Sequence, residues 1–226
     1  FGGMLMFDGD MSRGNIRQGE LDAYKAFDLL DGYYYAFKKY EKYKIAPFEP
    51  YCAKKFDAVF SGLPSAGRIE KSGRESVLSF LRGYDDRPFE FNSNVLYCAE
   101  TAADIFGIST REEYTVASLD KLINESATAL ITEEYGTKID ELSEKLDKGL
   151  SLDLLKMVAN NLDKKFLLAY TLKILLGDSI EYADKRRLWL VGDIMPQVFC
   201  AALYCCASIL NAKNNGKETQ NENSNS

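Results

Sequence analysis

One stretch of the chain decides how it folds: residues 188–210 read LWLVGDIMPQVFCAALYCCASIL. A run that is apolar on nearly all sides is typical of a helix that is buried in a core or crosses a membrane. Three basic residues at 185–187 precede it, as they flank the inner end of a membrane span. Asp193 and Pro196 lie in its first half, however, and a charge in hydrocarbon costs about 2.5–3.5 kcal/mol. We therefore prefer a buried helix kinked near Pro196, with membrane association through 188–210 as the alternative.

Working back from this stretch, the second half of the chain carries a series of helix signals. Ser109, followed three residues later by Glu112, forms a capping-box pattern that predicts a helix over 110–123. Apolar residues at helical spacing predict further helices over 126–135, 139–146 and 151–176, which end at Gly136, Gly149 and Gly177. Since each helix has its own stop signal, the pattern predicts an all-α multi-helix bundle.

The first half of the chain shows shorter helical patterns. They predict helices over 20–30, 33–43 and from Pro50 to Phe60, a short helix ending near Leu81, and one over 95–106. No alternating strand pair stands out. The predicted domains are a helical pair over 1–63, a helical bundle over 64–210 and a disordered tail over 211–226, where asparagine is frequent and large apolar residues are missing.

Composition excludes several kinds of chemistry. The 226 residues contain no histidine, which rules out serine–histidine and cysteine–histidine catalysis and histidine-ligated metals. The net charge of −6 argues against a general nucleic-acid binder. Five cysteines without CxxC spacing predict reduced, buried thiols in a cytoplasmic protein.

The densest polar motif lies at the start of the chain. Short oxygen-bearing residues alternate there, with a glycine, a branched apolar residue and then a glutamate, in the order Asp8, Asp10, Ser12, Gly14, Ile16 and Glu20. This order resembles an EF-hand calcium loop with a one-residue insertion at Arg13. The resemblance implies that Asp8, Asp10, Ser12 and Glu20 bind Ca²⁺, while Ile16 anchors the loop.

EF-hands pair, and a second candidate follows. Ile45 and Glu49 have the anchor-to-glutamate spacing of the first loop, but lysines and a tyrosine occupy the ligand positions. This segment would be a degenerate hand that is retained for packing. The alternative for residues 1–63 is a helical hairpin with polar turns.

The same aspartates support a different function. An apolar run followed by Asp8 and Asp10 resembles the start of haloacid-dehalogenase-type phosphatases, which implies that Asp8 is the nucleophile and Asp10 the general acid beside Mg²⁺. Later matches in order are Thr132, a lysine among Lys164, Lys165 and Lys173, and Asp193. That family needs a parallel sheet, whereas residues 132–190 have helical patterns, so we prefer a non-enzymatic protein that interacts with another protein.

Residues 33–56 combine aromatic rings with positive charge. Six lysines against two glutamates give this segment a charge of +4. The preferred arrangement turns the aromatic rings toward the core and spreads the lysine stems over the outer face. The alternative is that Tyr34, Tyr35, Tyr40 and Tyr43 stack on bases or lie at a lipid headgroup layer. Other carboxylates, such as Glu100 and Asp104, are expected on the solvated surface.

Overall fold

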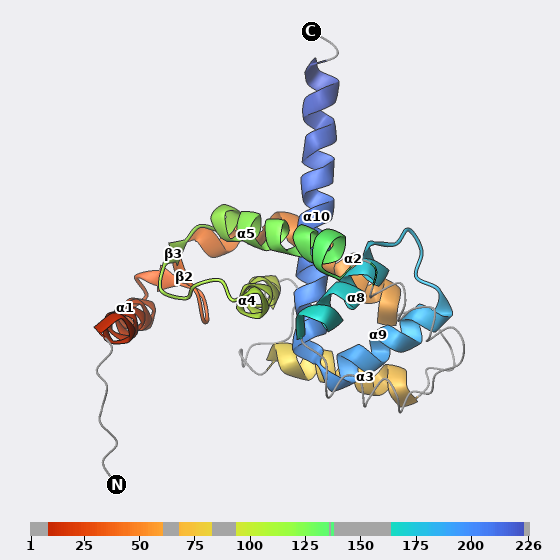
Figure 1. Ribbon diagram of the computed structural model, residues 1–226, viewed down its shortest axis with the longest axis horizontal. Coiled ribbons are helices and arrows are strands. Elements are labelled where there is room, and N and C mark those ends of the chain that lie inside the picture. Colours follow the sequence, from red (N-terminus) through yellow and green to blue (C-terminus); the bar gives the residue numbers. More distant parts are fainter. Residues whose placement is uncertain (1–8, 61–67, 83–93, 136, 138–163, 224–226) are drawn as a thin grey trace.

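The computed structural model describes residues 9–60, 68–82, 94–135, 137 and 164–223 (Figure 1). Its α-helices are α1 (Gly9–Ala26), α2 (Glu49–Phe60), α3 (Arg68–Arg82), α4 (Val95–Phe106), α5 (Val116–Ala129), α8 (Lys164–Leu176), α9 (Tyr182–Ile194) and α10 (Pro196–Asn223). A 3-10 helix η1 (Glu41–Phe48), a π-helical turn η3 (Leu130–Glu134) and three short strands complete the described chain. The predicted all-α multi-helix architecture is therefore confirmed.

Helix α10 forms the centre of this architecture (Figure 1). It packs against α2, α3, α4, α5, α8 and α9. Every residue over 198–208 is at most 1% exposed, which explains why the sequence is apolar on all sides there. The predicted kink is a full break, since α9 ends at Ile194 and Pro196 begins α10, where its missing N–H costs no hydrogen bond.

The apolar stretch of the membrane alternative belongs to two helices. The break at Met195 divides residues 188–210 between α9 and α10. Among the described residues, no helix combines the length and the apolar character that crossing a bilayer requires. Beyond the core, the backbone of α10 stays helical to Asn223, and this part stands clear of the other helices in Figure 1. The tail that was predicted to be disordered from residue 211 is thus helical over most of its length.

Two glycines allow α3 and α9 to approach closely. A Cβ atom on Gly73 of α3 would lie 2.2 Å from the backbone carbonyl oxygen of Trp189 in α9. A Cβ atom on Gly192 would lie 3.2 Å from the carbonyl oxygen of Gly73. Trp189 also donates its Nε1–H to the carbonyl oxygen of Val59 at 2.8 Å, which ties α9 to α2. The two backbones therefore touch directly at this crossing.

The region predicted as a helix over 33–43 has a different structure. Strand β1 (Leu30–Asp31) pairs antiparallel with β2 (Ala36–Lys38), and β2 pairs in parallel with β3 (Glu113–Tyr114). Gly32, with φ +107°, makes the turn between β1 and β2. The helix prediction was wrong because strands of two or three residues are too short to show an alternating pattern.

Helix α5 begins later than its sequence signal. The capping box is formed by Thr115 and Ser118, whose side chains each accept a hydrogen bond from the other residue's backbone N–H at 3.0 Å. The predicted start near residue 110 was wrong, because Glu113 and Tyr114 pair with β2 instead. By contrast, the helix predicted over 95–106 is α4 itself. The helix predicted over 139–146 and the first part of the helix predicted over 151–176 lie outside the described residues. Helix α8 forms the remaining part of the second of these helices.

The prediction of free, buried thiols is confirmed. All five cysteines are buried and free, and three of them, Cys200, Cys205 and Cys206, lie on α10. Burial raises the pKa of Cys206 to about 11, so its reactive thiolate form is rare at neutral pH. These thiols pack within the hydrophobic core.

Candidate interaction surface

The β1–β2 hairpin and the segments beside it carry an unusual group of exposed side chains. We call this group the aromatic–basic surface and define it as Phe27, Leu29, Lys39, Tyr40, Lys42 and Tyr43. Leu30 and Lys38 are paired across the hairpin, so Leu29 and Lys39 follow as neighbours at its open end. The surface is therefore built from two chain segments that the hairpin holds side by side.

Aromatic rings are stacked at the centre of this surface. The rings of Tyr40 and Tyr43 lie nearly parallel, with an interplanar angle of 20° and centroids 6.4 Å apart. Each side chain is 67% exposed. Lys39 Nζ lies 5.8 Å from the Tyr40 centroid, and Lys42 Nζ lies 5.6 Å from that of Tyr43. The prediction that these rings face the core was wrong for Tyr40 and Tyr43, which are held outward in two cation–π pairs.

Other aromatic residues of the segment do face the core. Tyr35 and Phe37 are fully buried, and the Tyr35 hydroxyl donates to the carbonyl oxygen of Ile108 at 2.9 Å. Tyr34 is exposed at the hairpin turn. The hairpin thus uses one set of aromatic rings for packing and leaves another in solvent.

Neighbouring carboxylates reduce the positive charge of the surface. Lys39 Nζ is 2.6 Å from Asp28 Oδ2, and Lys42 Nζ is 3.3 Å from Asp31 Oδ1. Hydrogen bonding to Lys39 lowers the pKa of Asp28, so this carboxylate stays ionised at neutral pH. The surface is consequently amphipathic and almost neutral overall, although its sequence is lysine-rich.

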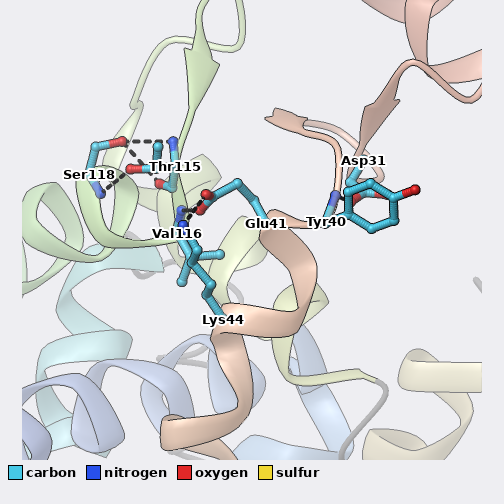
Figure 2. A network of polar contacts seen from close by, with 7 residues as sticks. All are labelled: Asp31, Tyr40, Glu41, Lys44, Thr115, Val116 and Ser118. Carbon is cyan, nitrogen blue, oxygen red and sulfur yellow. Dashed lines mark hydrogen bonds and ion pairs between the residues drawn. The ribbon is translucent and has the colours of Figure 1, made fainter.

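Two buried carboxylates hold the surface in place (Figure 2). Asp31 Oδ2 accepts the backbone N–H of Tyr40 at 2.7 Å and so supports its left-handed conformation, φ 71°. Glu41 Oε2 accepts the N–H of Val116 at 3.1 Å, at the first turn of α5. Lys44 is paired with the other oxygen of Glu41, and this hydrogen bond is the main cause that lowers the pKa of Glu41. Tyr40 is therefore positioned by β1 and η1 together.

Glu100 on α4 holds the other end of the hairpin. Its carboxylate is completely buried and accepts the backbone N–H groups of Tyr33 at 2.8 Å and Tyr34 at 2.7 Å. Lys25 Nζ donates to the carbonyl oxygens of the same two residues, at 3.0 and 3.3 Å. Burial raises the pKa of Glu100 to about 7, against the lowering effect of the N–H donors and of Lys25. The expectation that Glu100 lies on the solvated surface was wrong.

The predicted calcium ligands lie along a helix. Asp10, Ser12 and Glu20 all belong to α1, where the sequence predicted a loop, and Asp8 lies outside the described residues. Oppositely charged side chains one turn apart stabilise this helix. The Arg13 side chain donates a hydrogen bond to Asp10, and Arg17 donates one to Glu20 Oε2 at 2.7 Å. The hydrogen bond from Arg17 is the main cause that lowers the pKa of Glu20.

This helical conformation keeps the ligands apart. Ten residues separate Asp10 from Glu20, a rise of about 15 Å, whereas Ca²⁺ binds its oxygens at about 2.3–2.6 Å. Ile16, the predicted anchor of the loop, is 72% exposed on this helix. Within the described ranges, no three carboxylate or thiol groups gather closely enough to hold a metal ion. Calcium binding by these residues would require α1 to unwind.

Calcium binding stays a prediction with a direct measurement. If Asp8, Asp10, Ser12 and Glu20 form a site, calorimetry should detect Ca²⁺ binding and circular dichroism a loss of helix as α1 unwinds. The variant Glu20→Gln should abolish both signals, because it removes the bidentate ligand. Asp22→Asn, two residues further along α1, is the matched control. A titration without heat and without a spectral change would contradict the prediction.

The residues of the phosphatase interpretation are scattered. Thr132 lies in η3, Asp193 lies near the end of α9, and Lys164, Lys165 and Lys173 lie in α8. Asp193 accepts hydrogen bonds from Ser72 at 2.6 Å and Ser76 at 3.3 Å, so it joins α9 to α3. In the described part of the chain, the strands form one sheet of two- and three-residue segments, and none of them leads directly into Thr132, the lysines of α8 or Asp193. A catalytic sheet edge of the phosphatase type is not formed there.

Comparison with known proteins adds no relative. No family model, curated protein or solved structure matches this chain. Inference about its function therefore rests on the surface and on the residues that support it.

Sequence reasoning missed Glu100, Asp31 and Glu41 as supports of the surface. One signal was present for Glu100, which is the single charged residue over positions 95–103 of an otherwise apolar helix pattern. A lone charge on such a helix is buried together with its face and needs partners there. Asp31 and Glu41 carry no comparable signal, because polar residues are frequent in turns.

Proposed function

We propose that this chain is a non-enzymatic helical interaction protein that binds another protein through the aromatic–basic surface. The observation that supports the proposal most strongly is the stacked, solvent-exposed Tyr40–Tyr43 pair between two lysines. Tyrosine is enriched among residues that contribute most to protein binding, because a ring buries a large area at little cost in conformational entropy.

The charges of the surface favour a protein over a phosphate polymer. Lys39 and Lys42 are already paired with Asp28 and Asp31, so few counterions would be released on binding nucleic acid. The remainder of the chain is acidic, since a net charge of −6 includes the +4 of residues 33–56. A partner segment with apolar side chains would cover the rings. Carboxylates that flank these side chains would take the place of Asp28, which is largely exposed, in the ion pair with Lys39.

The supporting contacts favour a preformed site. Tyr40 is fixed by Asp31, and η1 is fixed to α5 through Glu41. A surface that is rigid before binding loses less conformational entropy when the partner binds. We place the protein in the cytoplasm, where its five buried thiols would stay reduced.

The proposal is tested with synthetic peptides rich in leucine, aspartate and glutamate. Tyr40→Asn and Tyr43→Ala should each weaken binding of the best peptide by about tenfold or more. Asparagine at position 40 retains the left-handed backbone, which alanine would strain. Affinity would be measured by fluorescence anisotropy on the full chain, together with the thermal midpoint of each variant.

The controls separate this surface from other exposed rings and from other ligands. Tyr182→Ala removes an exposed tyrosine of α9 and should leave peptide affinity unchanged. A single-stranded oligonucleotide and vesicles containing phosphatidylserine are titrated in parallel. Tighter binding of either probe, or equal affinities for the three tyrosine variants, would contradict the proposal.

A further inference from the structure

Two carboxylates stand in the same relation to the lysines of the aromatic–basic surface. Asp28 and Asp31 are three residues apart, as are Lys39 and Lys42. Asp28 pairs with Lys39 at 2.6 Å, and Asp31 pairs with Lys42 at 3.3 Å. The Nζ atom of each lysine also lies over the ring of the tyrosine that follows it. The surface therefore contains two similar units, each made of a carboxylate, a lysine and a tyrosine.

The carboxylate of the second unit, Asp31, is built into the fold. Its side chain is only 6% exposed, and Oδ1 pairs with Lys42. Its other oxygen, Oδ2, accepts the backbone N–H of Tyr40 at 2.7 Å (Figure 2). A partner carboxylate that displaced Asp31 would leave this N–H group without its acceptor, which is costly. Asp31 is therefore the fixed counterion of Lys42.

The carboxylate of the first unit, Asp28, can be displaced. Its side chain is 80% exposed, and water screens an ion pair at such a position, so the pair with Lys39 contributes little. Lys39 Nζ also donates to the main-chain carbonyl oxygen of Asp28 at 2.7 Å. This second hydrogen bond keeps the ammonium group in place when the Asp28 carboxylate moves away.

We propose that Lys39 is the point at which the aromatic–basic surface binds a carboxylate of its partner, and that Asp28 occupies this place in the free protein as an intramolecular competitor. The inference rests on the proposed function, since it assigns the charge selectivity of the same surface. A partner carboxylate at Lys39 meets an ammonium group that is already oriented beside the Tyr40 ring. Lys42, with its fixed counterion, offers no second place of this kind, so the surface recognises charge at one end only.

Asp28→Asn tests the competition directly. Asparagine tolerates the left-handed backbone of this residue, φ 57°, and the main-chain carbonyl oxygen still holds Lys39. Because the competing charge is removed, the best acidic peptide should bind about threefold more tightly. The same peptide with glutamine and asparagine in place of its glutamates and aspartates should bind as it does to the wild type. Fluorescence anisotropy on the full chain, at one ionic strength, gives both affinities.

A matched control separates this local effect from a change in net charge. Glu125→Gln removes a carboxylate on α5 whose side chain is 62% exposed and lies 3.9 Å from Lys121 Nζ. The net charge changes by the same amount as in Asp28→Asn, but both peptide affinities should stay at their wild-type values.

Substitution of the lysines locates the carboxylate of the partner. Lys39→Gln should abolish the preference for the acidic peptide over its neutral form, and Asp28→Asn should have no further effect in that background. Lys42→Gln should retain the preference. A preference that is lost in Lys42→Gln and retained in Lys39→Gln overturns the inference.

The outcomes distinguish the competition from the proposed function. If the tyrosine variants weaken binding but Asp28→Asn changes neither affinity, or raises both equally, the inference is overturned and the proposed function stands. If no peptide binds to the wild type or to Asp28→Asn, both are overturned. A gain that is confined to the acidic peptide and disappears in Lys39→Gln supports both.

Discussion

Gly73→Ala is expected to lower the free energy of unfolding by about 3 kcal/mol or more. The new Cβ atom would lie 2.2 Å from the carbonyl oxygen of Trp189, which is a backbone atom and cannot rotate away. Helix α9 would have to move outward by about an ångström, and its contacts with α3 and α2 would loosen. The higher helix propensity of alanine offsets only about 1 kcal/mol of this cost.

Gly19→Ala is the matched control for this substitution. Gly19 is also helical, in α1, but a Cβ atom there has no neighbour within 4 Å. The free energy of unfolding of this variant should rise by about 0.5–1 kcal/mol, because only the higher helix propensity of alanine acts there. Urea unfolding followed by circular dichroism gives both values. Equal effects at the two glycines would show that the close α3–α9 crossing is not required for stability.

Phe199→Ala should destabilise the protein by about 3–5 kcal/mol. Phe199 is fully buried on α10, and its ring centroid lies 5.3 Å from that of Phe60 on α2. Removing the ring leaves a cavity at the centre of the protein, where helices on several sides restrict relaxation.

Phe27→Ala makes the same chemical change at a ring that is 75% exposed. Its effect on the free energy of unfolding should stay within about 0.5 kcal/mol. Both variants would be compared by thermal and urea unfolding. If Phe199→Ala lowers the free energy of unfolding no more than Phe27→Ala does, α10 does not have the central role in stability that its burial indicates.

The sequence was most informative where the apolar pattern is long. Helix α4 was predicted with its observed bounds, because Val95 to Phe106 keep an uninterrupted helical pattern and Gly107 ends it with φ +73°. The burial of residues 198–208 followed from an apolar composition on every side of the helix. In both segments, local propensity and the final packing favour the same conformation.

The sequence was less informative where side-chain ion pairs or pairing between distant segments decide the structure. Residues 9–19 have the spacing of a metal loop, but ion pairs one turn apart and the burial of Leu21 favour a helix. The hairpin depends on pairing with β3, some 75 residues further along the chain, and no local pattern reports such a contact. The exposed tyrosines were placed in the core because aromatic residues are usually buried there.

The central position of α10 has a consequence for the order of synthesis. Helices α2 to α4 end by Phe106, yet the residues that complete their core lie about 90 to 100 positions further along the chain. At a translation rate of roughly 5–20 residues per second, these helices leave the ribosome about 5–20 s before α10 does. Their apolar faces have no permanent partner during that interval. A chaperone that shields nascent chains is therefore expected to raise the yield of folded protein.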